Sequence, residues 1–260
     1  MKPYWENKQY GLSMYLGNCL EVIPAIDRYY DFCVTSPPYA LGKEYEPGVG
    51  WRELKTLIAM LAHVMLPYFV SSKFCVINFG ETTTYRKTMA ELYNDAFQDA
   101  GWIMHSRRIW KKDFASTSLG PSDINLSVPV AEWEYLWSFR KPPSKKEVFR
   151  NRNLTRRGVW DSTGYKKVSG THPAAFPIWL PLTCMDAWTG INELVVDPFL
   201  GSGTTMEACY QAGRRCVGIE QSEEYAEKAA KRMETIVNQQ RLFEPRVLKS
   251  DKPKQHRLTV

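Results

Sequence analysis

VVDPFLGSGTT, residues 195–205, joins an apolar run to two glycines and the start of a helical pattern. The run is typical of a buried strand, and Gly201 and Gly203 permit a tight turn with close approach of a ligand to the main chain. The next apolar strand, CVGIE, ends at Glu220, where an acid in an open α/β sheet accepts hydrogen bonds from a ribose. The order of strand, glycines, helix, strand and acid predicts a nucleoside site. The alternative is a tight turn beside a solvated glutamate.

Strand and helix patterns alternate along the rest of the chain. Residues 52–69 and 82–100 show helical spacing, the second with Thr82 or Thr83 as N-cap, whereas 74–80, 103–112 and 133–141 are typical of strands. Several of these strands are apolar throughout. We therefore expect an α/β fold with a Rossmann-like, mostly parallel sheet and helices on both faces.

The length and composition favour one core in a reduced compartment. The chain has 260 residues, lacks a run of 18 apolar residues, and opens without the apolar segment of a signal peptide. Six scattered cysteines form no CxxC pair, so we expect small buried hydrophobes, and neither disulfides nor a metal site. We expect a single domain over residues 1–240, a basic tail over 241–260, and a cytoplasmic protein.

The net charge of +6 is concentrated in the middle of the chain. Residues 101–167 carry 14 Lys and Arg against 6 Asp and Glu. This excess indicates either a solvated basic face or a surface that binds a polyanion. Residues 141–170 are basic, poor in aliphatic side chains and without a clear period, so we expect a loop-rich segment there.

The glycine loop narrows the class of nucleoside ligand. It lacks the third glycine of a dinucleotide site and the lysine of a P-loop. Asp197, directly before it, is better suited to an ammonium than to a pyrophosphate. A nucleoside that carries an amino acid is S-adenosyl-L-methionine, which we therefore expect as the cofactor.

A second motif, TSPPY at residues 35–39, follows the apolar run DFCV. Two consecutive prolines end a strand abruptly, because neither donates a backbone hydrogen bond. Taken alone, the motif is compatible with a rigid strand exit and an incidental tyrosine.

Together, TSPPY and DPFLGSGTT resemble the amino-group DNA methyltransferases, which methylate cytosine N4 or adenine N6. The tetrapeptide Ser36–Tyr39 precedes the glycine loop, as in the permuted (beta) group. The resemblance implies the class I methyltransferase fold, with 1–240 as the catalytic domain and 141–170 as a small target-recognition insertion. It also implies double-stranded DNA as substrate and hence a nucleoid-associated protein. It implies catalytic roles for Ser36, Pro37, Pro38 and Tyr39. The cofactor-binding residues implied by motif and position are Asn18, Thr35, His172, Pro173, Phe176, Asp197, Phe199, Gly201, Ser202, Gly203, Thr204, Thr205 and Glu220.

The chemistry of an exocyclic amine explains the rigid corner. Its lone pair is delocalised into the ring, and acceptors for its N–H groups, here the Ser36 hydroxyl and the Pro37 carbonyl, favour a tetrahedral nitrogen. Rigid placement favours catalysis by orientation. The target base must leave the duplex, and Tyr39 can stack on it. No Pro-Cys pair exists for methylation of cytosine carbon 5.

The sequence motifs define the type of reaction more closely than they define the target base and the partners. Serine preceded by threonine is commoner in the N4-cytosine members, so we favour cytosine over adenine. An RNA or protein methyltransferase and a non-catalytic DNA-binding module are the rival classes. A cognate restriction endonuclease and a monomeric or dimeric state are both open. The residues expected to contact DNA are Lys111, Lys112, Lys145, Lys146, Arg150, Arg152, Arg156 and Arg157.

Overall fold

A computed structural model describes residues 1–38, 50–80, 88–112, 133–143, 151–162 and 176–242, without the side chains of Arg152 and of residues 240–242. In this part of the chain a nine-stranded sheet has the order β1-β2-β9-β8-β3-β4-β6-β5-β7. The strands are β1 (Trp5–Asn7), β2 (Leu12–Leu16), β3 (Tyr30–Thr35), β4 (Phe69–Phe79), β5 (Ile103–Lys111), β6 (Trp133–Arg140), β7 (Val159–Asp161), β8 (Leu194–Asp197) and β9 (Arg215–Glu220).

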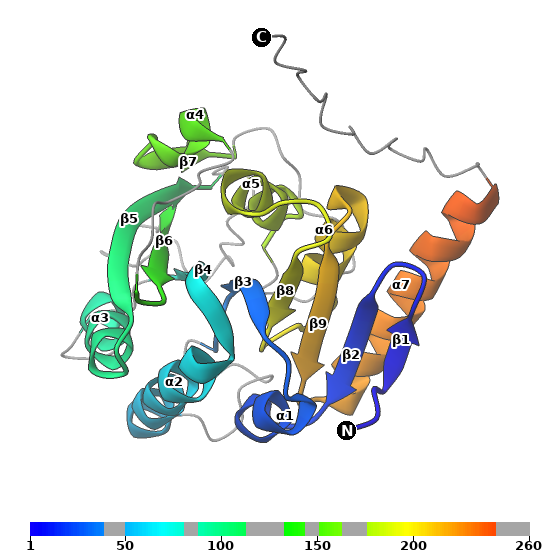
Figure 1. Ribbon diagram of the computed structural model, residues 1–260, viewed down its shortest axis with the longest axis horizontal. Coiled ribbons are helices and arrows are strands. Elements are labelled where there is room, and N and C mark those ends of the chain that lie inside the picture. The colour runs from blue at the N-terminus through cyan, green and yellow to red at the C-terminus, as the bar shows by residue number, and fades with distance from the viewer. Residues whose placement is uncertain (39–49, 81–87, 113–132, 144–150, 163–175, 243–260) are drawn as a thin grey trace, which may run out of the picture.

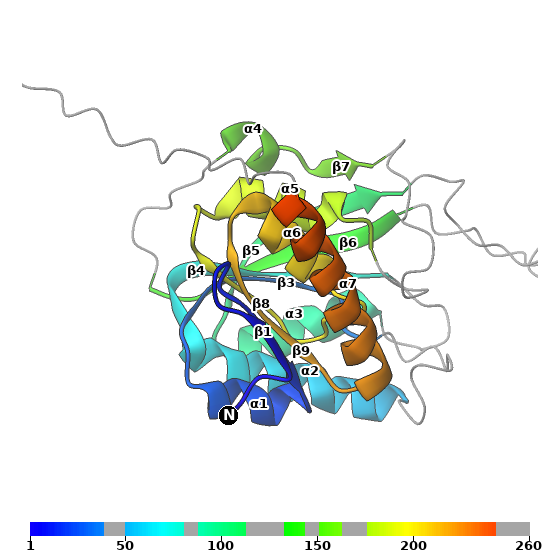
Figure 2. The same cartoon turned by 90° about the vertical axis from the view of Figure 1, so that its right-hand side faces the viewer.

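Helices cover both faces of this sheet, so the molecule has three layers (Figures 1 and 2). Five strand pairs are parallel, and the pairs that involve β1 or β6 are antiparallel. The expected α/β fold with a mostly parallel sheet is therefore confirmed. The helices are α1 (Cys19–Ile26), α2 (Trp51–Met65), the 3-10 helix η1 (Leu66–Tyr68), α3 (Met89–Asp99), α4 (Arg152–Thr155), α5 (Trp179–Trp188), α6 (Thr204–Ala212) and α7 (Glu223–Leu242).

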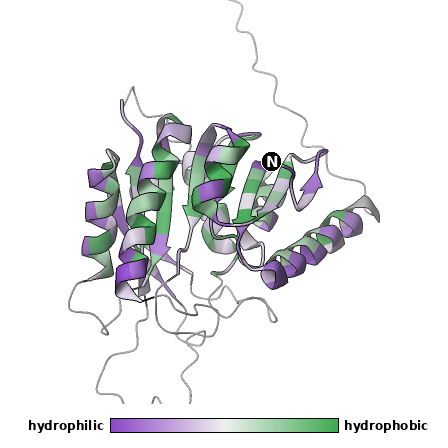
Figure 3. Cartoon of the chain, turned by 90° about the horizontal axis from the view of Figure 1, so that it is seen from below, coloured by the Kyte–Doolittle hydropathy of each residue, from purple (hydrophilic) through white to green (hydrophobic). Residues whose placement is uncertain are grey.

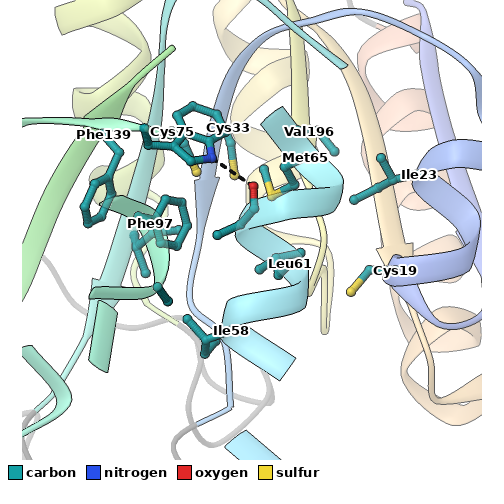
Figure 4. Packing of buried hydrophobic residues seen from close by; sticks show 14 of the residues in the cluster. Cys19, Ile23, Cys33, Ile58, Leu61, Met65, Cys75, Phe97, Phe139 and Val196 are labelled. Atoms are coloured by element: carbon teal, nitrogen blue, oxygen red, sulfur yellow. Dashed lines mark hydrogen bonds between the residues drawn. The ribbon is translucent and has the colours of Figure 1, made fainter. Parts of the chain in front are cut away.

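Each face of the sheet has its own apolar core. One lies beneath α1, α2 and α3, where the Phe97 and Phe139 rings stack 4.3 Å apart and Cys33 neighbours Cys75 (Figure 4). The other lies beneath α5, α6 and α7. The central strands are mostly hydrophobic, and much of α7 is hydrophilic (Figure 3). All six cysteines are buried and free, as expected of small hydrophobes.

One local expectation needs correction, and a second segment contains two short elements that no pattern predicted. The helix expected from residue 82 begins at Met89, because Thr88 caps it: the Thr88 hydroxyl accepts from the Glu91 amide at 3.1 Å, and the Glu91 carboxylate accepts from the Thr88 amide at 2.9 Å. Within the segment expected to be loop-rich, residues 151–162 form α4 and the edge strand β7, which pairs with β5. Their order comes from tertiary contacts rather than from a periodic pattern.

Candidate active site

The sheet changes direction between β3 and β8. From β8 the chain continues through α6 to β9 on one side, and from β3 it continues through α2 to β4 on the other. In open α/β sheets ligands bind outside the carboxyl ends of the strands at such a switch point. Thr35 and Asp197 are the last residues of these two strands, so the proline corner and the glycine loop leave the sheet side by side.

A hydrogen bond joins the two motifs across this switch point. The Thr35 hydroxyl donates to Asp197 Oδ1 at 2.6 Å, and the Phe199 amide donates to the same oxygen at 3.0 Å. Thr35 and Asp197 are both buried. Residues 162 positions apart in the sequence thus share one site.

The environment of Asp197 opposes its ionisation. Burial raises the pKa of this carboxyl to about 6, and the negative charge of Glu220 adds to the rise. The nearby Thr205 and Thr35 hydroxyls and the Phe199 amide act in the opposite direction, because they stabilise the ionised form. Asp197 therefore fixes the geometry of the loop, and its pairing with a ligand ammonium stays a prediction.

Glu220 closes the glycine loop from the adjacent strand. Its Oε2 accepts from the Gly201 amide at 2.7 Å, and its Oε1 accepts from the Ser222 amide at 2.8 Å. A carboxylate has about four lone-pair directions, so both oxygens keep capacity for a ribose hydroxyl. The main chain is open at Gly201: a Cβ built there would meet no atom within 4 Å.

At Gly203 the missing side chain allows close packing and leaves no open space for a ligand. It has a φ of 86° and caps the start of α6. A Cβ at Gly203 would lie 3.2 Å from the Cβ of Ala229 in α7. The second glycine of the motif thus allows α7 to pack against the loop, whereas Gly201, with a φ of 55°, faces free space.

Asn18 lies next to Glu220 at the same edge. Leu16 pairs with Glu220 in the sheet, and the Gly17 amide donates to the Glu220 carbonyl at 2.9 Å. Asn18 caps α1, with its Oδ1 accepting from the Leu20 amide at 3.0 Å. This cap uses one acceptor of the carboxamide, and its predicted contact with adenine remains a prediction.

The other predicted cofactor residues are mostly buried where the structure describes them, and their contact with a cofactor stays a prediction. Ser202, Thr204 and Thr205 are buried beneath the loop, and Phe199 is half-buried against the core under α1 and α2. Phe176 is 9% exposed and belongs to the core under α5 and α6. At the corner, Ser36 and Pro38 are half-buried and Pro37 is buried. Tyr39, His172 and Pro173 lie outside the described residues.

Arg232 of α7 is a part of the site that the sequence analysis missed. Its guanidinium donates to the Ser202 carbonyl at 3.1 Å and pairs with Glu207 of α6. It thereby holds the glycine loop against α6 and α7. Its sequence context, a lysine- and glutamate-rich helix, gives no sign of this role, because α7 carries several exposed pairs such as Lys228–Glu224.

The predicted DNA contacts differ in their exposure. Arg156 and Arg157 are exposed, and Lys111 forms an exposed ion pair with Asp161. Lys112 pairs with Glu134 at 2.8 Å, with the two side chains only 20% and 15% exposed, so its charge is less available to a phosphate than the sequence suggested. The side chain of Arg152 and all of Lys145, Lys146 and Arg150 lie outside the described residues.

The described residues form neither a candidate metal site nor a helix that could span a membrane. Among them, no group of three or more His, Cys, Asp and Glu side chains could hold a metal ion. None of the helices that the structure describes has both the length and the apolar character needed to cross a bilayer.

Known proteins are similar to this chain in sequence and in architecture. In an alignment of 302 positions the chain is 24% identical to the Type II methyltransferase M.BglI of Bacillus subtilis, with 86% of each chain covered. The PvuII DNA methyltransferase (cytosine-N4-specific) has the same fold, with a TM-score of 0.70 at 20% identity over 91% of this chain and 93% of its own. The structure of the M1.HpyAVI–SAM complex matches with a TM-score of 0.64 at 24% identity, over 85% of this chain and 98% of its own.

The match to a protein family covers most of the chain. Residues 30–231 fit the N6/N4 methyltransferase family, described as DNA methylase. This range contains the proline corner, the glycine loop and Glu220. The protein therefore belongs to this family of DNA methylases, whose members methylate exocyclic amino groups.

Proposed function

We propose that the protein transfers a methyl group from S-adenosyl-L-methionine to the exocyclic N4 of cytosine in double-stranded DNA. The observation that carries this proposal is the 2.6 Å hydrogen bond between Thr35 and Asp197. It links the strand end that leads into Ser36–Tyr39 to the strand end that leads into the glycine loop. Acceptors for the target amine and the proposed cofactor loop then lie at one point of the sheet edge.

The residues present fit this methyl donor. The main chain at Gly201 is open to a ligand, and Asp197 and Glu220 place two acids beside it. In our proposal Glu220 binds the ribose and Asp197 faces the amino-acid ammonium, with Asn18 near the adenine. The cofactor supplies an electrophilic methyl group when it is bound, as it is in the complex of M1.HpyAVI.

The catalytic residues act on the target amine. The Ser36 hydroxyl and the Pro37 carbonyl accept hydrogen bonds from its N–H groups and orient the nitrogen lone pair. The two prolines keep these acceptors in place, which favours catalysis by orientation. Tyr39 stacks on the base once it has left the duplex. The methylated nitrogen is strongly acidic, so water can take its proton.

The choice of cytosine rests on Ser36, and N6 of adenine is the alternative. An uncharged hydroxyl at the first position of the tetrapeptide is a weaker acceptor than a carboxylate. In the family this residue, preceded by threonine, is commoner among enzymes of cytosine N4. By the corner-before-loop order we also assign the chain to the permuted group.

Nucleoside analysis of methylated DNA tests the reaction and the base together. Unmethylated plasmid is incubated with the protein and S-adenosyl-L-methionine, digested to nucleosides and analysed by mass spectrometry, with a cofactor-free reaction as control. We expect N4-methylcytosine. N6-methyladenine would reassign the base within the same chemistry, whereas DNA without any modified nucleoside would contradict the proposed activity.

The organisation and partners follow from the same proposal. Residues 1–240 form one catalytic domain, residues 141–170 contact the DNA, and 241–260 form a basic tail. Contacts to phosphates position the protein on the duplex, while specificity needs contacts to base edges. The similarity to M.BglI, a Type II methyltransferase, supports the presence of a cognate restriction endonuclease.

A further inference from the structure

Arg108 of β5 is a buried arginine without a carboxylate partner among the described residues. Only 3% of it is exposed. Burial lowers the pKa of its guanidinium, since a buried cation loses its hydration. Its neighbour Arg107 points to the opposite face of the same strand, because side chains alternate along a strand.

Two nitrogens of the Arg108 guanidinium donate to the main chain of one segment. Nη2 donates to the Thr155 carbonyl at 2.7 Å, and Nε donates to the Arg157 carbonyl at 3.2 Å. The third, Nη1, donates to the Ser106 hydroxyl on its own strand. The two carbonyls flank Arg156. One planar guanidinium thus fixes the backbone on both sides of an exposed arginine, which an ammonium, as a point charge, does not reproduce.

Two tryptophans complete the enclosure of Arg108. Its guanidinium carbon lies 5.5 Å from the ring centroid of Trp160 and 4.9 Å from that of Trp188, within the range of cation–π attraction. Trp160 belongs to β7 and donates to the Leu154 carbonyl at 3.1 Å. The turn after α4 is therefore tied to the sheet from several directions.

The segment 151–162 has a second attachment on its outer side. Asn151 Nδ2 donates to Asp186 of α5 at 2.8 Å, and Asn151 Oδ1 accepts from the amides of Asn153 and Leu154. In Figures 1 and 2, α4 and β7 lie beside α5 at one end of the molecule. A substitution at Asn151 can therefore perturb the same segment without changing Arg108.

The register of the sheet places this attachment at the level of the catalytic corner. Arg108 pairs with Leu136, which pairs with Asn78. Asn78 comes one residue after Ile77, the partner of Thr35. Across β4 and β6, Arg108 therefore stands at the height of Ser36, and the exposed side chains of Arg156 and Arg157 project from a segment fixed at that edge.

We propose that Arg108 is a positioning residue for DNA binding, which holds residues 155–157 so that Arg156 and Arg157 meet the phosphates of a duplex bound at the Ser36 edge. This inference rests on the proposed function. Arg108 touches neither DNA nor cofactor itself. Its loss should weaken duplex binding through Arg156 and Arg157, and should leave the cofactor site unchanged.

The test compares Arg108→Lys with Arg107→Lys, a matched control on the same strand. Binding to a short mixed-sequence duplex is measured at low salt by fluorescence anisotropy, and binding to S-adenosyl-L-methionine by calorimetry. We expect Arg108→Lys to weaken duplex binding about tenfold and Arg107→Lys less than about twofold, since the two charge-assisted hydrogen bonds to the segment are affected in the first variant alone. Cofactor affinity should be the same in both.

A double-mutant cycle separates positioning from general stability. In an Arg156→Ala, Arg157→Ala background, Arg108→Lys should add less than about a twofold loss, because its effect passes through those side chains. An additive tenfold loss, or an equal loss of cofactor affinity, would overturn the proposal. Mixed-sequence DNA makes this readout independent of whether the wild-type protein methylates cytosine, adenine or neither.

Asn151→Ala covers the case in which Arg108→Lys does not fold. It removes the attachment to Asp186 without altering the buried cluster around Arg108. We expect duplex affinity to fall less, about threefold, while the melting temperature of the protein and its cofactor affinity stay unchanged. If duplex binding by a folded Asn151→Ala equals that of the wild type and Arg108→Lys is unfolded, the positioning role is rejected in favour of a purely structural one.

Discussion

The glycine loop and the segment 151–162 both lie at the edge of the sheet where the proline corner ends, but they are held differently. The loop is closed mainly by the motif's own parts, since Gly201 and Ser222 donate to Glu220 at the end of the next strand, and Arg232 of α7 adds a hydrogen bond to the Ser202 carbonyl. The segment 151–162 is held by Arg108 and by the pairing of β7 with β5, on a strand about 50 residues earlier in the chain. In our proposal a compact motif binds the cofactor, whereas the surface for DNA is assembled from distant parts of the chain.

Ser36→Ala should give the largest effect, because in our proposal Ser36 accepts a hydrogen bond from the target amine and so acts in the reaction itself. We expect methyl transfer to slow about 100-fold, the loss typical of one preorganised hydrogen-bonding group in an active site. Affinities for S-adenosyl-L-methionine and for duplex DNA should stay within about twofold. Single-turnover transfer of tritiated methyl measures the rate, with Thr235→Ala on the exposed side of α7 as control. A wild-type rate would remove the acceptor role of Ser36.

Because the glycine loop is a local motif and the segment 151–162 is held by distant residues, the sequence predicts the first better than the second. Gly201, Glu220 and the strand that ends at Asp197 are identifiable because each residue type suits one position of a βα unit. The meeting of Thr35 with Asp197 follows from the resemblance and from the rule that parallel strands end at one edge. These inferences use local patterns and chain order.

Arg108 and Arg232 were not predicted, for a physical reason. Both are arginines on elements with several charged neighbours, and only the fold determines which of them turns inward. Arg107 and Arg108 are adjacent in the sequence, yet one is exposed and the other is enclosed by two tryptophans. Strand β7 was missed because three residues show no period, and its pairing with β5 comes from a contact across about 50 positions.

Glu220→Gln tests the glycine loop, the first of the two regions, without changing the segment 151–162. The Gly201 and Ser222 amides donate to different oxygens of Glu220, and glutamine replaces one of these oxygens by an NH₂ group, which cannot accept a hydrogen bond. Glutamine also carries no charge. A charge-assisted hydrogen bond contributes about 1.5–3 kcal/mol, so we expect cofactor affinity to fall about 30-fold. Duplex affinity should not change. Calorimetric titration measures the first and anisotropy the second, and equal losses in both would show that the two regions are not independent.

Asp197 provides a test based on pH. Its pKa is about 6 in the folded state against an ordinary value of 3.8, so the native state retains the proton to higher pH than the unfolded chain does. Stability from this group is present below pH 3.8 and is lost as the pH rises through 6. Relative to Asp197→Asn, which cannot ionise, the wild type should lose about 2 kcal/mol of unfolding free energy between about pH 4.5 and 7.5.

Urea unfolding of both proteins across this pH range measures the difference, and effects of other titrating groups cancel in the comparison. Parallel pH profiles of the two proteins would contradict the buried position of Asp197. Added S-adenosyl-L-methionine should reduce the wild-type loss above pH 6, because a ligand ammonium favours the ionised carboxylate.

The two glycines of the loop should respond differently to alanine, although each substitution carries about 1 kcal/mol of backbone strain. Both have positive φ, 55° at Gly201 and 86° at Gly203. Gly203→Ala also brings a Cβ to 3.2 Å from that of Ala229, so it should lower the melting temperature further than Gly201→Ala does. Gly201→Ala meets no protein atom, and its methyl group extends into the space left for a ligand. We therefore expect the larger loss of stability at Gly203 and the larger loss of cofactor affinity at Gly201. The opposite ranking in calorimetry would place the cofactor away from the open side of the loop, and the compact motif would then serve the fold alone.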